Sequence, residues 1–282
     1  MKGESRKQKV ESRKSKAESQ KQKVMLFNEI AYGPIHSRRL GVSLGMEIMP
    51  LEHKLCTFNC VYCECGWNET VQHPKLPTRE EIRTALEAKL REMAHGTSNG
   101  TSPDVITFSG NGEPTLHPDF KGIIEDTCAL RDRYCPSAKV SVLSNSTQLG
   151  REEVVEALLL CDNRILKLDA ATDEMMHRID LPVNNGLTVA TIINYLSQFD
   201  GDFTLQTCFL RGEHAGQPID NTTPEQLSAW YKAVETLHPK EVMIYVIDRK
   251  TPEEHLEKIS REEMESIAAP LREKGYAVSI SA

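Results

Sequence analysis

Four of the eight cysteines fall within ten residues, and three of them have the residue type and spacing of metal ligands. Cys56, Cys60 and Cys63 form a C-x3-C-x2-C pattern on one short segment. Thiolates are soft ligands that favour iron–sulfur clusters and zinc. Structural zinc usually takes four ligands that arrive as separated pairs, and here only Cys65 is near enough in the sequence to be a fourth. The pattern therefore favours a [4Fe–4S] cluster with one iron left open, and zinc bound with the help of Cys65 is the alternative.

A glycine-rich stretch that ends in a carboxylate, Ser109-Gly-Asn-Gly-Glu113, follows the apolar segment 104–109. Glycine has no Cβ and so allows a backbone to come close to a ligand. A tight turn between a strand and a helix would need the same residues, so a G-x-G fragment has little specificity by itself. Its place at the end of an expected strand favours a ligand-binding role.

Polar side chains also end the next two strand-like segments. Ser144 and Asn145 close the segment 139–144, where they suit either a turn with a helix cap or hydrogen bonds to a bound ligand. Lys167 and Asp169 are two residues apart in the following segment, so they point to the same face of a strand. Because buried charges are rarely unpaired, we interpret these two either as a mutual ion pair or as contacts to a cofactor carboxylate or a substrate.

Two further strand-like segments carry weaker candidates. Gln206 and Cys208 share one face of the segment 203–210, and we expect Gln206 to be an interior hydrogen-bonding residue. A buried free cysteine is usually a small hydrophobic residue, and a radical relay or an extra ligand is the alternative for Cys208. The segment after it ends in three residues that could reach a substrate, Tyr245, Asp248 and Arg249. No ligand spacing accompanies the remaining cysteines, which we expect to be inert: Cys128, Cys135 and Cys161.

These residues need a scaffold, and the sequence alternates short apolar segments with longer amphipathic ones. It predicts strands near 43–49, 104–109, 139–144, 165–170, 203–210, 242–247 and 276–281, and helices near 78–94, 118–131, 150–160, 188–198, 224–237 and 260–274. Three of the helices begin at cap patterns, Thr78 with Glu81, Thr223-Pro224 with Gln226, and Ser260 with Glu263. Six strand–helix units predict a parallel sheet with right-handed crossovers, either as a partial barrel or as an open doubly wound sheet. In both, ligands bind at the carboxyl ends of the strands, where the polar residues fall.

The chain has 282 residues, 39% hydrophobic and 27% charged, which is the balance of a globular protein. Residues 1–24 are a three-fold repeat of seven with a net charge of +6, so residues 25–282 carry −13. Each repeat has one small apolar residue, too few for a coiled coil, and we expect a disordered tail before a core domain at 25–282. The sequence has neither a spanning apolar run nor a secretory signal, so we expect no membrane contact and a cytoplasmic location.

The cysteine spacing, with Tyr62 just before the third cysteine, resembles the signature of the radical S-adenosylmethionine (SAM) superfamily. Within it, Tyr32-Gly-Pro-Ile-His-Ser-Arg-Arg-Leu-Gly-Val-Ser-Leu-Gly45 resembles a group of iron–sulfur oxidoreductases related to the wyosine-forming tRNA-modifying enzymes. The resemblance covers most of 26–282 and is clearest in 31–66 and 104–117. The sequence departs from the tRNA-modifying members in having no cysteine before Cys56 for a second cluster, and no flavodoxin-like domain.

This resemblance implies an α/β fold with a partial (βα)6 TIM-like barrel of the radical SAM type. It implies a [4Fe–4S] cluster held by Cys56, Cys60 and Cys63, with SAM on the open iron. An electron donor such as flavodoxin or ferredoxin would drive cleavage of SAM to a 5′-deoxyadenosyl radical that acts on an unidentified substrate. We expect the cofactor to be contacted by residues around the cavity: Tyr62, Gly110, Asn111, Gly112, Glu113, Ser144, Asn145, Lys167, Asp169 and Gln206.

Three other functions stay as alternatives on the sequence alone. One is a wyosine-like modification of tRNA, which the acidic core does not favour because phosphate contacts come from clustered Lys and Arg. Another is an activase that installs a glycyl radical on a partner protein. The third is a non-catalytic iron–sulfur or zinc protein, such as an electron carrier.

Overall fold

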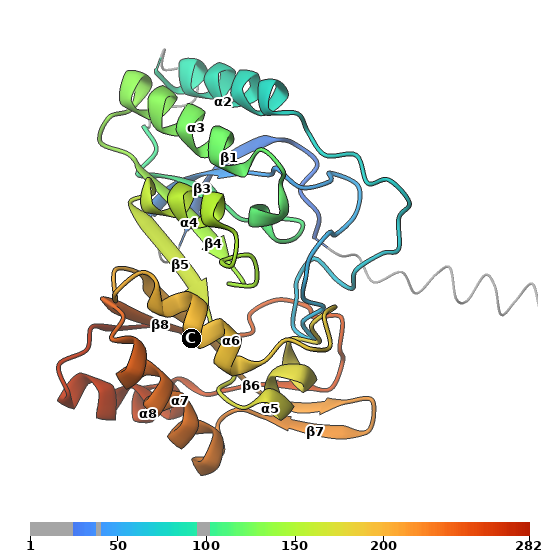
Figure 1. The fold of residues 1–282 in the computed structure, drawn as a ribbon, viewed down its shortest axis with the longest axis vertical. Helices are drawn as coiled ribbons and strands as arrows, with labels where there is room; N and C mark the ends of the chain where they lie inside the picture. Colours follow the sequence, from blue (N-terminus) through green and yellow to red (C-terminus); the bar gives the residue numbers. More distant parts are fainter. Residues whose placement is uncertain (1–24, 38–40, 95–101) are drawn as a thin grey trace, which may run out of the picture.

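The structure, a computed structural model, describes residues 25–37, 41–94 and 102–282 and is built on one curved sheet (Figure 1). The basic repeat at 1–24 lies outside the described residues. Within the described residues the sheet has ten strands, and its main path runs β1-β2-β3-β4-β5-β6-β8-β10. The strands are β1 (Ala31–Ser37), β2 (Gly41–Met46), β3 (Val105–Phe108), β4 (Lys139–Ser144), β5 (Asn163–Lys167), β6 (Thr204–His214), β7 (Gln217–Asp220), β8 (Glu241–Val246), β9 (Leu256–Lys258) and β10 (Val278–Ser281).

Along this path, every pair of neighbouring strands from β2 to β10 is parallel, as the strand–helix alternation predicts. β1 adds an antiparallel edge beside β2, and β7 and β9 pair with the far half of β6. The path ends at β1 on one side and at β10 on the other, so the barrel is open. Among the two predicted architectures, the structure therefore has the partial barrel.

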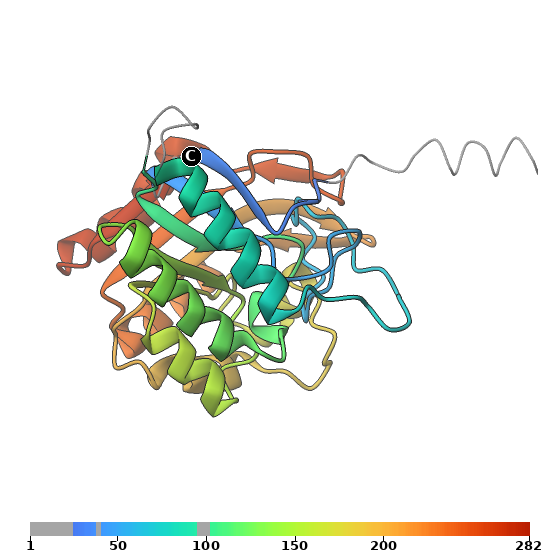
Figure 2. The same cartoon turned by 90° about the horizontal axis from the view of Figure 1, so that it is seen from above.

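Helices connect the parallel strands and cover the outer side of the sheet (Figures 1 and 2). They are α2 (Arg79–Ala94), the short 3-10 helix η1 (Pro114–Leu116), α3 (Phe120–Tyr134), α4 (Glu152–Leu159), α5 (Asp173–Ile179), α6 (Val189–Ser197), α7 (Pro224–Leu237) and α8 (Arg261–Glu273). The predicted caps are present: Thr223 accepts the Gln226 N–H, and Ser260 with Glu263 forms a capping box before α8. No helix within the described ranges is long and apolar enough to cross a membrane.

The two faces of the sheet differ in chemistry because side chains alternate along each strand. On the outer face Leu166 and Leu205 lie opposite each other and are fully buried. The inner face carries small polar residues on β2 and β3, where the Ser43 and Thr107 hydroxyls are hydrogen-bonded to each other at 2.9 Å. The helices therefore pack on an apolar surface, whereas the inner face carries polar side chains among apolar ones such as Val105, Ile165 and Met243.

Replacing Leu166 with alanine tests this core. Leu166 is 0% exposed in the middle of the parallel sheet, so its loss leaves a cavity and should lower the free energy of unfolding by about 3 kcal/mol. Urea unfolding would show a lower midpoint with an unchanged slope. The matched control is Leu160→Ala, at a leucine that is 48% exposed, which should change the free energy by less than about 0.5 kcal/mol. Equal effects of the two substitutions would contradict the burial of this face.

Candidate functional site

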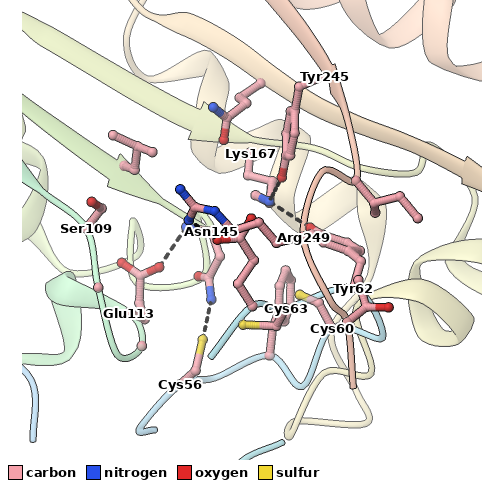
Figure 3. Close-up of a pocket in the computed structure, with 18 of the residues that line it drawn as sticks. Cys56, Cys60, Tyr62, Cys63, Ser109, Glu113, Asn145, Lys167, Tyr245 and Arg249 are labelled. Carbon is pink, nitrogen blue, oxygen red and sulfur yellow. Dashed lines mark hydrogen bonds and ion pairs between the residues drawn. The ribbon is translucent and has the colours of Figure 1, made fainter. Parts of the chain in front are cut away.

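A cavity of about 290 Å³ opens at the carboxyl ends of the parallel strands (Figure 3). The strands β3, β4, β5, β8 and β10 deliver residues to its wall at or just beyond their carboxyl ends, and β6 contributes Gln206 from near its start. The wall includes the three clustered cysteines and, from successive strands, Ser109, Gly110, Gly112, Glu113, Leu143, Ser144, Asn145, Lys167, Gln206, Tyr245 and Ser281. Segments that are far apart in the sequence therefore meet at the edge where a parallel sheet binds its ligands.

The cysteine-bearing loop is fixed to this edge by backbone hydrogen bonds from both sides. On one side Leu55 donates to Asn111 at 2.9 Å and accepts from the Glu113 N–H at 3.1 Å. On the other side Asn59 and Val61 donate to the carbonyls at the end of α5, at 2.8 and 2.9 Å. The backbone of the loop is therefore fixed by hydrogen bonds to the protein on both sides.

All three cysteines of the C-x3-C-x2-C pattern line the cavity, and Figure 3 shows their sulfur atoms on one side of it. Within 25–37, 41–94 and 102–282, no three His, Cys, Asp or Glu side chains are grouped as ligands of a single metal ion. Two of the three thiols have a polar side-chain neighbour: Asn145 donates to the Cys56 sulfur at 3.4 Å, and Cys60 donates to Asp180 at 3.4 Å. The Asn145 side-chain N–H aimed at the Cys56 sulfur is a hydrogen bond of the kind that iron–sulfur clusters receive from proteins, so the three thiols and this donor fit a cluster. On binding iron, Cys60 would give up the proton that it donates to Asp180.

Lys54 places a buried positive charge beside these sulfurs. Its side chain is 2% exposed, and its ammonium donates to the Gly66 carbonyl at 3.0 Å. Burial alone would lower the pKa of Lys54, but the neighbouring cysteine sulfurs, Cys63 most of all, raise it above its usual value. A hydrogen bond from Cys65, together with the charge of Lys54, lowers the pKa of the Cys63 thiol despite its burial. Burial raises the pKa of the Cys56 and Cys60 thiols, although the charge of Lys54 opposes both shifts. Of the three, only Cys63 is therefore held toward the thiolate, the form in which cysteine binds metal.

The two glycines of the glycine-rich stretch are required by close packing. A Cβ on Gly110 would lie 2.0 Å from a Glu47 carboxylate oxygen, and a Cβ on Gly112 would lie 1.7 Å from the Leu55 carbonyl oxygen. No other residue fits at either position without moving its neighbours. Both glycines line the cavity, so their backbone is open to a ligand on the opposite side.

Glu113 joins the ends of β3 and β4. Its buried carboxylate accepts hydrogen bonds from the Thr115 N–H at 3.1 Å, the Ser144 hydroxyl at 2.9 Å and the Asn145 N–H at 2.7 Å. Burial raises the pKa of Glu113, and these hydrogen bonds oppose that shift. Asn145 in turn donates to the Thr57 hydroxyl at 2.8 Å. Three of the residues predicted as ligand contacts therefore form one network that also reaches the cysteine loop.

Deeper in the barrel, Lys167 is surrounded by polar groups of three elements. Its ammonium donates to the Tyr62 and Tyr245 hydroxyls, both at 2.6 Å, and lies 3.4 Å from an Asp169 carboxylate oxygen. Tyr62 also donates to Asp169, whose other oxygen accepts the Cys208 N–H at 2.7 Å. Burial would lower the pKa of Lys167, but the charge of Asp169 and the other acidic neighbours raise it well above its ordinary value. Lys167 and Asp169 therefore form the ion pair that their spacing allowed.

Comparison with known proteins identifies the family. The profile of the Radical SAM superfamily matches residues 53–220, which include the cysteine loop and β3 to β6. The chain belongs to the radical SAM superfamily. The resemblance of the cysteine pattern to this superfamily is thus confirmed.

Curated relatives of this radical SAM protein include a UPF0026 protein of Synechocystis sp., 30% identical over 228 residues that cover 78% of this chain and 76% of the relative. A protein of Brachyspira hyodysenteriae named GTPase Obg is 29% identical over 246 residues, 86% of this chain but 33% of that protein. A UPF0026 protein of Helicobacter pylori is 28% identical over 65% of this chain and 57% of its own length. This chain spans about a third of the Brachyspira protein and little more than half of the Helicobacter one. It contains no Gly-Lys pair, which the phosphate loop of GTPases requires.

Solved structures show the same fold. TYW1 with a lysine-pyruvate adduct bound has a TM-score of 0.58 at 16% identity, covering 82% of this chain and 73% of that one. SuiB of Streptococcus suis bound to the precursor peptide SuiA has a TM-score of 0.59 at 14% identity, covering 96% of this chain and 52% of that one. At these identities the likeness concerns the fold, and the predicted partial barrel of the radical SAM type is confirmed.

The structure brings together most of the residues that the sequence predicts around the radical SAM cofactors. Asn111 and Asp169 lie behind the wall of the cavity rather than in it. The Asn111 amide bonds the backbone of Phe27 and Pro50 on the other side of the strand. Cys208 is fully buried and is not part of the wall either. At the rim, Arg249 forms an ion pair with Glu64 at 2.6 Å.

Sequence patterns did not identify three residues that the structure places close to this site. Lys54 lies two positions before Cys56, and only its closeness in the sequence could have drawn attention to it. Asp180 comes at the end of α5, a helix of seven residues that no periodic pattern marked. Glu47 directly follows β2, and its contact with the glycine-rich stretch depends on the pairing of β2 with β3.

Proposed function

We propose that this protein is a radical SAM enzyme that binds a [4Fe–4S] cluster through Cys56, Cys60 and Cys63 and cleaves SAM reductively. The observation that carries the proposal is the convergence of these thiols with the glycine-rich stretch and with Asn145 at one cavity. When bound, the reduced cluster supplies the electron that breaks a carbon–sulfur bond of SAM, giving methionine and a 5′-deoxyadenosyl radical. The substrate would bind in the same cavity.

The chain's own residues have distinct tasks in this proposal. The backbone of Gly110 and Gly112 receives the amino end of SAM, with Glu113 as the nearby negative charge. Asn145 lies between Glu113 and the Cys56 sulfur, so it orients the cofactor against the cluster. Lys167 and Tyr245 lie on the opposite wall and are positioned for the substrate.

Anaerobic reconstitution tests the proposal directly. The full chain is loaded with iron and sulfide, reduced, and mixed with SAM, and 5′-deoxyadenosine is measured by chromatography. We expect 5′-deoxyadenosine only in the reduced, cluster-loaded sample. A cluster that is present by absorption and electron paramagnetic resonance but forms no 5′-deoxyadenosine would exclude the enzyme. Zinc retained in place of iron would instead support the zinc alternative.

The lysine in this cavity is unsuited to the adduct chemistry named for the TYW1 structure. An amine must be neutral to attack a carbonyl carbon. Lys167 is held as an ammonium because the Asp169 carboxylate raises its pKa well above the ordinary value. We therefore expect incubation with pyruvate and borohydride at neutral pH to leave Lys167 unmodified, as checked by peptide mass spectrometry. A pyruvate-derived mass increase on Lys167 would contradict this assignment.

A further inference from the structure

Glu47 is a buried carboxylate that the proposed chemistry does not use. It follows β2 directly and is 1% exposed. One carboxylate oxygen accepts the Met49 N–H at 2.7 Å, and the other accepts the Asn111 N–H. Within the described ranges, no Lys, Arg or His nitrogen forms an ion pair with it, so backbone amides balance its charge.

The contact between Glu47 and the glycine-rich stretch is close and specific. The carboxylate occupies the space that a Cβ on Gly110 would need, as the 2.0 Å approach shows. Asn111 is held on the same side by its own side chain, which donates to Phe27 at 2.7 Å and to Pro50 at 3.0 Å. The glycine-rich stretch is therefore held by contacts on the side away from the cavity, while Gly110 and Gly112 line the cavity on the other side.

Keeping a charge at this position costs stability. Burial raises the pKa of Glu47 to about 7, although the hydrogen bonds from Asn111 and Met49 oppose the shift. The titratable groups that face it are the Tyr32 hydroxyl, on β1, and the Cys65 thiol, on the cysteine loop. Neither is a cation. A neutral side chain of the same shape would avoid the cost of removing a charge from water. We therefore infer that the carboxylate at this position serves function rather than folding stability.

We propose that Glu47 is a positioning residue for SAM: by accepting the Asn111 N–H, it fixes the backbone at 109–112 in the conformation that binds the amino end of the cofactor. The inference rests on the proposed function, in which this stretch contacts SAM. A loosened backbone would keep the cysteine ligands and the cluster but would lose affinity for SAM.

The proposal predicts a pH dependence with a defined sign. The carboxylate accepts hydrogen bonds through both oxygens, whereas the protonated acid has one oxygen that must donate. Because the pKa of Glu47 is raised to about 7, the carboxylate accepts both backbone hydrogen bonds above this pH. As the pH falls below this value, the side chain is protonated and one of these hydrogen bonds is progressively lost. Loss of a hydrogen bond to a charged group changes a binding free energy by enough for about a tenfold change in affinity. We therefore expect SAM to bind about tenfold more weakly at about pH 6 than at about pH 8.

Equilibrium dialysis of labelled SAM against the oxidised, cluster-loaded protein tests this without turnover. We expect Glu47→Gln to bind SAM about tenfold more weakly at about pH 8, and to show no difference between about pH 6 and about pH 8. The matched control is Glu52→Gln, an exposed carboxylate five residues on, which should keep both the affinity and the pH profile of the wild type. The iron content should be equal in all three proteins.

Two outcomes separate the failure of this inference from that of the proposed function. If the wild type binds SAM but Glu47→Gln binds equally well with the same pH profile, Glu47 has no positioning role. If the cluster-loaded wild type binds no SAM at either pH, the proposed function is excluded and the role of Glu47 is excluded with it. The wild-type pH profile needs no variant, so a flat profile contradicts the proposal even if Glu47→Gln does not fold.

Discussion

Cys60→Ala is expected to lose the iron–sulfur cluster and to form no detectable 5′-deoxyadenosine. Cys60 is the central ligand of the three, and its loop is tied to the end of α5 through the backbone of Asn59 and Val61. The variant would keep two of the three thiol ligands of the proposed cluster. No other residue of the cavity wall offers a thiol at the position of Cys60. Iron and sulfide content after reconstitution, together with chromatography of the SAM cleavage products, measures the effect.

Cys161→Ala is the matched control for this prediction. Cys161 is also buried, at 2% exposure, but its sulfur donates to the Ala157 carbonyl within the helical layer, away from the cavity. This variant should load iron and cleave SAM as the wild type does. Equal loss of iron in both variants would mean that cysteine replacement acts through folding, and full retention in Cys60→Ala would remove Cys60 from the ligand set.

The parallel core of the fold could be predicted because its signals are local. The apolar segments that became β3, β4 and β8 are short and buried, and they alternate with amphipathic helical stretches, so the strands and helices lie within a few residues of the expected bounds. The segment near 203–210 proved longer, because β6 runs on to His214. Its added part pairs with β7 and β9, a contact that the alternation of strands and helices does not contain.

Other elements were missed for physical reasons that can be stated. β1 carries Gly33 and Pro34 and pairs with β2 through a register shift, so it shows no regular alternation. α5 has seven residues, about two turns, which is too short for a helical period to stand out. In the site, the spacing of the cysteines was enough to predict that they lie together. The direction of the Asn111 side chain, away from the cavity, was not predictable in this way, because it depends on hydrogen bonds to Phe27 and Pro50, which are remote in the sequence.

Lys54→Met is expected to weaken cluster retention by about 10–100-fold, the usual effect of removing a partner of the ligands rather than a ligand. Lys54 is the buried cation whose charge interacts with Cys56, Cys60 and Cys63. Without it, the thiolates that bind iron would be buried with less compensation, and adding an electron to the cluster would cost more. The fraction of iron kept against a chelator should fall, and the midpoint potential in a spectroscopic redox titration should become more negative.

Lys54→Arg separates charge from packing in this prediction. Arginine keeps the positive charge, although its planar head cannot reproduce the geometry of the ammonium that donates to Gly66 at 3.0 Å. If charge is what matters, the arginine variant should retain much more iron than the methionine variant and shift the potential less. If both variants lose iron equally while the cluster-free proteins unfold at the wild-type urea concentration, the hydrogen bond to Gly66 rather than the charge holds the loop. Cluster retention and potential unchanged in Lys54→Met would show that a positive charge beside these sulfurs is not needed, because the backbone hydrogen bonds of the loop already suffice.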